Sequence, residues 1–258
     1  MTANPLKALR GAGKPVLNGW LSIASPFAAE IVAAQGYDSV TIDMQHGMID
    51  DGQALAMLQA LRGTGVIPLA RAPWNRPEPI MKALDMGALG IICPMVNSPE
   101  EAAAFVACLR YPPRGARSFG PTRAAFSGGA DYVRRADEMV TGLAMIETAE
   151  GLAAVEAIAR TPGLDGLYIG PSDLTLGVAQ GRLAPGFDRE EPEMLAAIHS
   201  ILKAAKGAGV LAALHCGSPE YAAKALGWGF DMVTLPNDVR LLASGAAESV
   251  ARTRRLLG

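Results

Sequence analysis

Ser39-Val40-Thr41-Ile42-Asp43 and Ile67-Pro68-Leu69-Ala70-Arg71 are the stretches that decide the fold. Each is a short uncharged run that ends in a charged side chain, and the two charged residues lie 28 positions apart (43 to 71). Uncharged runs of this length are typical of parallel strands that are buried on both faces. Because a helical pattern lies between them, the pair predicts one strand–helix–strand unit.

The same unit recurs along the whole chain. We expect further strands at Val16–Leu21, Leu89–Pro94, Leu143–Glu147, Gly166–Gly170, Leu211–His215 and Asp231–Leu235. About eight units in 258 residues predict a single (β/α)8 TIM barrel, with residues 1–258 as one domain. The alternative, a doubly wound sheet, would more usually carry a glycine-rich fingerprint after its first strand, and Gly19-Trp20-Leu21-Ser22 is not one.

Several helix starts are also readable. Ser98-Pro99-Glu100-Glu101 has a capping serine, a proline at the first helical position and a glutamate three residues after the serine. Asn75-Arg76-Pro77-Glu78 has the same spacing, and Ser25-Pro26 and Ser218-Pro219 also combine a cap with a proline. We expect a helix to begin at each of these four places.

Composition excludes several classes of protein. Hydrophobic residues make up 50% of the chain and charged residues 19%, which argues against disorder. A net charge of -2 gives no general attraction to nucleic acid or to anionic membranes, so neither is expected as a partner. The apolar stretch at 86–96 contains two glycines and a proline and is too short to span a bilayer.

Cysteine usage and the N-terminal residues indicate the compartment. Cys93, Cys108 and Cys216 have neither CxxC spacing nor an even count, which favours a reducing compartment. Residues 1–15 lack the apolar core of a secretory signal. We therefore expect a cytoplasmic protein.

Two connections are longer than the rest. Residues 111–140 are rich in Arg, Gly and Pro, and residues 175–193 contain several Gly and Pro. We expect both to lie on the face formed by the C-terminal ends of the strands, where barrel enzymes build their sites.

Polar side chains at the ends of the second and third strands predict a catalytic group. His46 follows Asp43 by three residues, and that carboxylate can hold the imidazole in one tautomer, as a general base requires. Arg71 can bind an anionic substrate or a developing oxyanion. The structural alternative is that His46 packs in a loop and Arg71 pairs with Asp43. With only three histidines in the chain, the position of His46 near an arginine at a strand end favours the functional interpretation.

Two carboxylates follow the fifth and sixth predicted strands. Glu147 and Asp173 lie 26 positions apart (147 to 173), which places them at the ends of neighbouring strands. Like charges this close are unfavourable unless a proton or a cation lies between them, and oxygen ligands suit Mg²⁺ or Mn²⁺. Alternatively, Asp173 caps the helix that follows. The residues alone leave the metal site and the cap equally supported.

Other polar residues give weaker signals. Trp20 lines the pocket or belongs to the core at the end of the first strand, with equal support for each. His215 is expected in the pocket wall or core, and His199 on a helix surface. Gly217-Ser218 and Asn237-Asp238 are a weak signal for a phosphate site at a helix N-terminus.

Five groups of residues, taken in order, are more specific than any of these signals. They are Gly36-Tyr37-Asp38 with Ile42-Asp43-Met44-Gln45-His46-Gly47, Ala70-Arg71-Ala72-Pro73-Trp74-Asn75, Tyr111-Pro112-Pro113-Arg114-Gly115-Ala116-Arg117, Met145-Ile146-Glu147-Thr148, and Ile169-Gly170-Pro171-Ser172-Asp173-Leu174. From Asn18 to Asn237 the chain resembles the metal-dependent (class II) pyruvate aldolases of the HpcH/HpaI family, of the 4-hydroxy-2-oxoheptanedioate and 2-dehydro-3-deoxyglucarate aldolase type. The resemblance implies a (β/α)8 barrel, often with the last helix swapped between subunits of a hexamer built from dimers.

The resemblance also implies roles for individual residues. It implies that Glu147 and Asp173 bind a divalent metal (Mg²⁺, Mn²⁺ or Co²⁺). It implies that His46 is the acid/base residue and that Asp43 orients it. Arg71 would bind the pyruvate oxygens. The backbone around Gly170 and Ser172 would hold the pyruvate carboxylate. Asp85 matches an acid that joins the histidine network, expected to act across a subunit interface. Relatives often have Glu at the position of Gln45, which we therefore expect near the water shell of the metal.

The implied reaction is the reversible cleavage of 4-hydroxy-2-oxo acids to pyruvate and an aldehyde through a metal-stabilised pyruvate enolate. No lysine ends a predicted strand, which argues against a Schiff-base aldolase. An acyl-CoA lyase similar to the citrate-lyase β relatives would require a longer chain and a basic groove for the CoA phosphates. Oxaloacetate decarboxylation is another alternative, because it passes through the same enolate. A barrel that has lost catalysis and a phosphosugar isomerase are the remaining alternatives.

Overall fold

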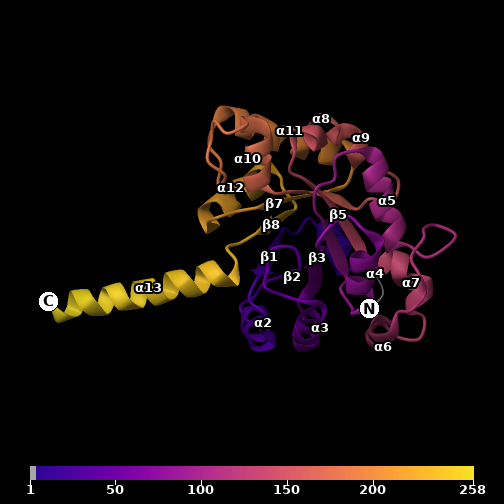
Figure 1. The fold of residues 1–258 in the computed structure, drawn as a ribbon, viewed down its shortest axis with the longest axis horizontal. Coiled ribbons are helices and arrows are strands. Elements are labelled where there is room, and N and C mark those ends of the chain that lie inside the picture. The colour runs from indigo at the N-terminus through magenta and orange to yellow at the C-terminus, as the bar shows by residue number, and fades with distance from the viewer. Residues whose placement is uncertain (1–3) are drawn as a thin grey trace.

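The structure, a computed structural model, describes residues 4–258. Eight parallel strands form a closed barrel in sequence order, and helices surround it (Figure 1). The strands are β1 (Val16–Leu21), β2 (Ser39–Asp43), β3 (Ile67–Arg71), β4 (Gly90–Cys93), β5 (Thr141–Ile146), β6 (Gly166–Ile169), β7 (Leu211–His215) and β8 (Met232–Thr234). The predicted (β/α)8 barrel is confirmed, and the doubly wound sheet is wrong because β8 pairs with β1.

The helices follow the strands in the order expected of such a barrel. They are α1 (Pro5–Gly11), α2 (Pro26–Ala33), α3 (Asp51–Ala60), α4 (Pro77–Asp85), α5 (Pro99–Leu109), α6 (Thr122–Gly128), α7 (Tyr132–Met139), α8 (Ala149–Ala153), α9 (Val155–Ala159), α10 (Pro171–Ala179), α11 (Pro192–Ala208), α12 (Pro219–Trp228) and α13 (Asp238–Leu257). Within the described chain, no helix is both long and apolar enough to cross a membrane.

A helix begins at all four predicted places, and three of the four predicted caps are confirmed. The hydroxyls of Ser25, Ser98 and Ser218 accept the backbone N–H three residues on. The capping box at Ser98 is half formed, because the carboxylate of Glu101 accepts from the N–H of Asn97 instead. The cap at Asn75 is wrong. α4 begins one residue later, after Arg76, and the Asn75 amide donates to the carbonyl of Glu101.

Alternation along the strands separates two cores. Ala212 and Leu214 of β7 join the large cluster between barrel and helices, whereas Leu211 and Ala213 join a second cluster inside the barrel. Successive strand side chains point to opposite faces, so every second residue points inward. At the C-terminal end of each strand, the next inward-facing residue after the last apolar one points towards the barrel axis. These residues therefore meet at the C-terminal mouth of the barrel.

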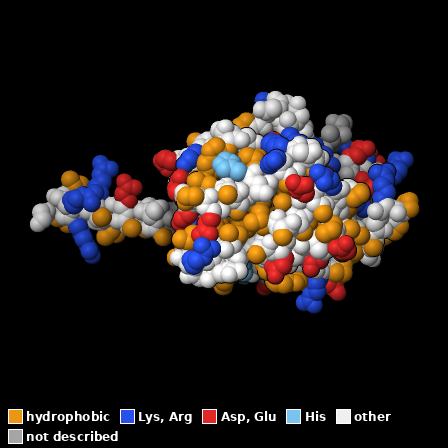
Figure 2. All heavy atoms as spheres, turned by 90° about the horizontal axis from the view of Figure 1, so that it is seen from above, with side chains coloured by type: hydrophobic (Ala, Val, Ile, Leu, Met, Phe, Trp, Pro, Cys, Tyr) orange, Lys and Arg blue, Asp and Glu red, His pale blue; other side chains and the backbone are white. Residues whose placement is uncertain are grey.

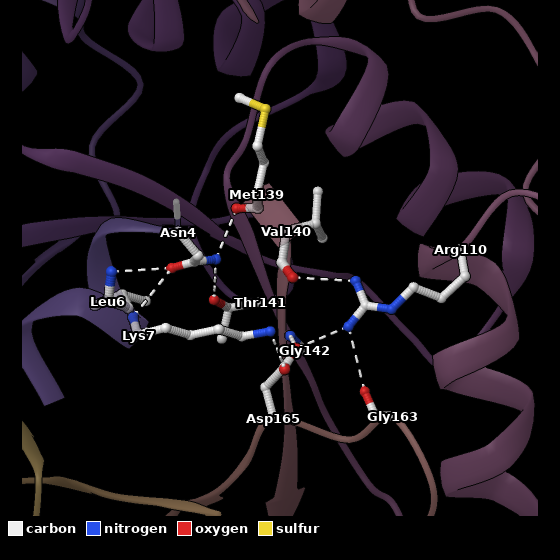
Figure 3. A network of polar contacts seen from close by, with 10 residues as sticks. All are labelled: Asn4, Leu6, Lys7, Arg110, Met139, Val140, Thr141, Gly142, Gly163 and Asp165. Atoms are coloured by element: carbon white, nitrogen blue, oxygen red, sulfur yellow. Dashed lines mark hydrogen bonds and ion pairs between the residues drawn. The ribbon is translucent and has the colours of Figure 1, made fainter. Parts of the chain in front are cut away.

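The opposite end of the barrel is closed by α1. The Asn4 side-chain amide donates to the carbonyl of Met139 at 2.6 Å, and Lys7 forms an ion pair with Asp165 at 2.7 Å (Figure 3). Arg110 also reaches Asp165 at 2.9 Å, so one carboxylate joins α1, α5 and the start of β6. This network covers the barrel at the N-terminal ends of its strands. A functional site is therefore expected at the C-terminal ends.

The two long connections lie at different ends, which corrects one expectation. Residues 111–140 follow α5 and form α6 and α7 before β5, so they lie at the N-terminal end beside the start of β3. A segment between a helix and the next strand returns to that end, whatever its composition. Residues 175–193 follow β6 and reach the C-terminal end as expected, through Phe187.

The last helix, α13, extends away from the barrel (Figure 1). In the space-filling view it is a separate arm that carries both hydrophobic and basic side chains (Figure 2). Its large apolar side chains are exposed, with Leu242 at 66% and Leu257 at 82%.

Candidate active site

A cavity of about 480 Å³ opens at the C-terminal end of the barrel. Its lining comes from the ends of seven strands and the segments that follow them. The residues are Trp20, Ser22, Asp43, His46, Met48, Arg71, Met145, Glu147, Gly170, Pro171, Ser172, Asp173, Phe187, His215, Cys216, Pro236, Asn237, Val239 and Arg240. Most of the predicted site residues therefore lie in one pocket.

Strand alternation explains why these side chains converge. Asp43 and Arg71 are paired across β2 and β3, and both continue the inward-facing set of their strands. Glu147 lies two residues after the inward-facing Met145, as His215 does after Ala213. The spacing that builds the core therefore also places the polar side chains.

Arg71 and Asp43 form a buried, bidentate ion pair. Arg71 Nε and Nη2 donate to the two carboxylate oxygens at 2.8 and 2.7 Å, and Trp20 Nε1 donates to the same carboxylate at 3.2 Å. Burial opposes the charge on Asp43, but the hydrogen bond and positive charge of Arg71 outweigh it and lower the pKa of this carboxyl. The Arg71 guanidinium also lies 4.8 Å from the Trp20 ring centre. Its position is therefore fixed on two sides.

His46 lies at the rim of the pocket with an exposed side chain. Asp43 contacts it through the backbone, since the His46 N–H donates to Asp43 Oδ1 at 3.2 Å. Among the described residues, no hydrogen bond joins the Asp43 carboxylate to the His46 imidazole, so the expected control of the ring tautomer by Asp43 is not seen. The structure combines the ion pair of the structural alternative with a pocket position for the histidine.

Glu147 is buried, with 3% of its surface exposed, and its carboxylate accepts the N–H of Met95 at 2.8 Å. Burial raises its pKa to about 7, with a further contribution from the negative charge of Asp173. The Met95 hydrogen bond and the more distant charge of Arg71 oppose this shift only partly. Glu147 is therefore a carboxylate that forms no ion pair with any of residues 4–258.

The surroundings of Glu147 fit a divalent ion. A Cβ added to Gly170 would lie 2.8 Å from Met145 Cε and closer still to Glu147 Oε2, so the glycine keeps this space open. Asp173 lies in the first turn of α10 and is exposed, and the N-cap of that helix is Gly170, so the capping alternative is wrong. Among the described residues, no three His, Cys, Asp or Glu side chains lie close enough together to bind one metal ion. A metal held by Glu147 and Asp173 would therefore have water or substrate in its other coordination positions.

His215 belongs to the pocket wall, as expected. Its ring lies 4.7 Å from Trp20 and 4.8 Å from Phe187, and its Nδ1 is 3.2 Å from the Tyr168 hydroxyl. Burial lowers its pKa to about 3, and the charge of Arg71 adds to this effect. His215 is therefore neutral at physiological pH. His199 is exposed on α11, also as expected.

The weak phosphate signal is wrong, because side chains of this chain already bind the polar groups at both helix starts. Asp188 accepts the N–H of Gly217 at 2.6 Å and the hydroxyl of Ser218 at 2.7 Å. At the start of α13, Asp238 accepts the N–H of Val239 at 2.9 Å and Asn237 accepts the N–H of Arg240 at 3.0 Å.

Gln45 and Asp85 do not lie in this pocket. The Gln45 side-chain oxygen is buried without a hydrogen-bond partner within the described chain, instead of facing the cavity. Asp85 ends α4, at the opposite end of the barrel, and pairs with Arg117 at 2.7 Å. Within one chain neither residue joins His46.

The pocket also contains Phe187 and Arg240, which the sequence patterns do not predict. Phe187 is contributed by the connection between α10 and α11, and Arg240 by the first turn of α13. No strand-end pattern marks either residue. Met145 and Pro236 also line the pocket, and two-residue alternation along β5 and β8 is the signal that predicts them.

A closed barrel with two arginines and three carboxylates in its C-terminal pocket defines a (β/α)8-barrel enzyme. The chain belongs to the HpcH/HpaI aldolase/citrate lyase family, whose model matches residues 17–244. It is 43% identical over 253 residues to a hydroxypyruvate/pyruvate aldolase of Rhizorhabdus wittichii, covering 98% of this chain and 100% of that one.

Two further similarities agree with this family. A 4-hydroxy-2-oxo-heptane-1,7-dioate aldolase of Klebsiella pneumoniae is 33% identical, covering 96% of this chain and 93% of the relative. The crystal structure of an HpcH/HpaI aldolase/citrate lyase family protein from Burkholderia cenocepacia superposes with a TM-score of 0.89 at 32% identity, covering 96% and 98% of the two chains. The family predicted from the sequence motifs is confirmed.

Proposed function

We propose that this protein is a class II aldolase that reversibly cleaves 4-hydroxy-2-oxo acids to pyruvate and an aldehyde. The observation that carries the proposal is the pocket in which Arg71 faces the buried carboxylate Glu147 and its neighbour Asp173. Relatives named as a hydroxypyruvate/pyruvate aldolase and as a 4-hydroxy-2-oxo-heptane-1,7-dioate aldolase support the same reaction for this chain. In this proposal residues 1–258 work as one barrel domain.

Glu147 and Asp173 would hold a divalent ion, with Mg²⁺, Mn²⁺ and Co²⁺ as the candidates. When bound, such an ion supplies Lewis-acid stabilisation of negative charge on the substrate oxygens. The buried Glu147, with its raised pKa, gains the cation that the protein itself does not provide.

Arg71 acts as a fixed positive charge beside the keto oxygen of pyruvate. Because Asp43 and Trp20 hold its guanidinium, little reorganisation is needed as negative charge develops on that oxygen. The backbone from Gly170 to Ser172 begins α10, and the N-terminus of that helix suits the pyruvate carboxylate.

His46 is placed to move a proton at the rim of the pocket. In the condensation direction its imidazole takes a proton from the pyruvate methyl carbon, and in the cleavage direction it returns one. The hydrogen bond that the His46 backbone N–H donates to the Asp43 carboxylate positions this loop.

Two alternatives receive less support from the pocket. Among the described residues that line it there is no lysine, and the arginines are Arg71 and Arg240, so it lacks the basic groove that acyl-CoA phosphates require. Oxaloacetate decarboxylation fits the same residues and would accompany the aldolase activity as a side reaction.

The same proposal extends to assembly and location. α13 would be swapped between subunits of a homohexamer built from dimers, since its Leu242 and Leu257 are exposed here. Asp85 would act on the histidine network of a neighbouring subunit. Cys93, Cys108 and Cys216 are all buried and free, which supports the cytoplasm as the location.

The test is exchange of the pyruvate methyl protons for deuterium, followed by NMR. Chelator-treated protein should show little exchange, and added Mn²⁺ or Mg²⁺ should restore it. Glu147→Gln should abolish the restored exchange, whereas the exposed control His199→Gln should behave like the native protein. Absence of exchange with every metal would overturn the proposed function.

A further inference from the structure

Polar side chains from four strands meet inside the barrel, beneath the pocket. The side-chain oxygen of Asn18 on β1 accepts the hydroxyls of Ser39 and Thr41 on β2, at 2.8 and 3.1 Å. The amide nitrogen of Asn18 donates to the hydroxyl oxygen of Thr234 on β8 at 3.0 Å. That oxygen lies 2.7 Å from the hydroxyl of Tyr168 on β6. These five buried side chains form an interior polar cluster.

Hydrogen bonds in the interior polar cluster have one direction that gives every hydroxyl proton an acceptor. Thr234 already accepts the Asn18 amide, and its one other side-chain hydrogen bond within residues 4–258 is with Tyr168. Thr234 therefore donates to Tyr168, because a buried hydroxyl proton without an acceptor is unfavourable. The proton of Tyr168 is then free for His215 Nδ1, which lies 3.2 Å from the tyrosine oxygen.

This direction determines which nitrogen of His215 carries the proton. The imidazole is neutral, because burial and the charge of Arg71 lower its pKa to about 3; Asp43 opposes this shift and Arg240 adds to it. A neutral imidazole has one N–H. Since Nδ1 accepts from Tyr168, the proton is on Nε2. Nε2 has no hydrogen-bond partner among residues 4–258 and is not a buried atom, so its N–H is open to the pocket.

The His215 ring faces the substrate space from a fixed position. It packs between Trp20 and Phe187, with ring centres 4.7 and 4.8 Å away. His215 ends β7 and Arg71 ends β3, and these strands are opposite each other in a closed ring of eight. Both residues line the cavity of about 480 Å³. With pyruvate beside Arg71, the second substrate would lie between pyruvate and His215.

We propose that His215 donates its Nε2–H to the carbonyl oxygen of the aldehyde, and that the interior polar cluster holds it in the tautomer that can do so. The inference rests on the proposed aldolase function and adds a catalytic residue to the same site. In the condensation, the pyruvate methyl carbon loses one proton and bonds to the aldehyde carbon, and the aldehyde oxygen gains one proton. His215 keeps its own proton and stabilises the negative charge that develops on this oxygen.

The first test measures the tautomer in metal-free protein labelled with ¹⁵N-histidine. The chain has three histidines, so the signals lost in His215→Leu identify this residue. Two-bond ¹⁵N–¹H correlations should show the proton on Nε2. Tyr168→Phe removes the donor to Nδ1 and should give a mixture of tautomers. The matched control is Tyr111→Phe, which removes a buried hydroxyl without a hydrogen-bond partner among the described residues and should leave the His215 signals unchanged.

The second test separates the aldehyde from pyruvate. With propanal, whose carbonyl oxygen is its one polar atom, His215→Leu should lower kcat/KM for condensation about tenfold, as expected for one lost hydrogen bond. Metal-dependent exchange of the pyruvate methyl protons should stay native in this variant, because the exchange needs no aldehyde. His215→Gln keeps an N–H donor and should retain more of the condensation rate. Tyr168→Phe should show a smaller loss than His215→Leu, and Tyr111→Phe none.

The outcomes separate this inference from the function on which it rests. A proton on Nδ1 of His215 in the native protein would overturn the inference, whatever the exchange experiment shows. Equal losses of exchange and condensation in His215→Leu would also overturn it, and the aldolase function would stand. Absence of exchange in the native protein would overturn the aldolase function and the role on the aldehyde together.

Discussion

At the scale of single residues, the Arg71–Asp43 pair couples stability to the site. Both side chains are nearly buried, so removing either charge leaves the other without compensation. Arg71→Met should therefore lower the free energy of unfolding by about 3–5 kcal/mol. Urea unfolding of the chelator-treated protein measures this loss.

A double variant controls that experiment. Asp43→Asn combined with Arg71→Met removes the buried charge as well as its partner, so it should be more stable than Arg71→Met alone. If the double variant is as unstable as the sum of both single variants, the two side chains do not interact as the structure indicates.

Glu147 predicts an unusual pH dependence for the metal-free protein. Its pKa is near 4.5 when unfolded and about 7 when folded, so the folded state binds more protons between these values. Its contribution to stability is thus lost as pH rises from about 4.5 to 7 and stays lost above. Glu147→Gln should make the metal-free protein more stable at pH 8 by roughly 3 kcal/mol, with a smaller gain at pH 5.

Melting temperatures at both pH values, with chelator and with Mn²⁺, measure this effect. The exposed carboxylate Glu150 provides the control, since Glu150→Gln should show no such pH-dependent gain. Mn²⁺ should stabilise the native protein more than Glu147→Gln by ligand linkage. Equal stability of native protein and Glu147→Gln at pH 8 would contradict the buried, cation-free state of this carboxylate.

At the scale of elements, the junction of β6 and α10 shapes the carboxylate pair. Gly170→Ala places a methyl group against Met145 and Glu147, which must move. The change should cost about 1–3 kcal/mol in stability and reduce metal-dependent proton exchange.

The control is Gly207→Ala in α11, where an added Cβ meets nothing within 4 Å. This variant should keep the native stability or gain slightly, because alanine is a better helix former than glycine in the last turn of α11, and it should keep the native exchange rate. Native exchange in Gly170→Ala as well would mean that the close approach to Glu147 does not constrain the site.

Local patterns predicted the strands and the residues that follow them, but not the segments between elements. Asp43, Arg71 and Glu147 were predictable because each lies at the end of an apolar run, where alternation decides its direction. The α6–α7 region was assigned to the wrong end because composition does not tell whether a loop precedes or follows a helix. Arg240 and Phe187 come together through the contacts of Asp188 and Asp238, which span 29 and 216 residues and leave no local signature.

At the scale of the whole molecule, α13 predicts an assembly. Val239, Leu242, Ala246, Val250 and Leu257 follow one another at helical spacing on this exposed helix. Leu242→Asp should weaken association and shift the mass measured by light scattering towards smaller species. Arg252→Gln, a change outside this apolar stripe, should leave the mass unchanged. An unchanged mass in Leu242→Asp would argue against α13 as a subunit contact.

The carboxylate of Asp188 fills the amide and hydroxyl positions at the start of α12. Many barrels use the loops after their seventh and eighth strands to grip a phosphate group. Here the Asp188 carboxylate already occupies these hydrogen-bond donors, so a phosphate ester cannot bind to them. The enzyme should therefore tolerate inorganic phosphate as a buffer, and sugar phosphates should be poor inhibitors of it.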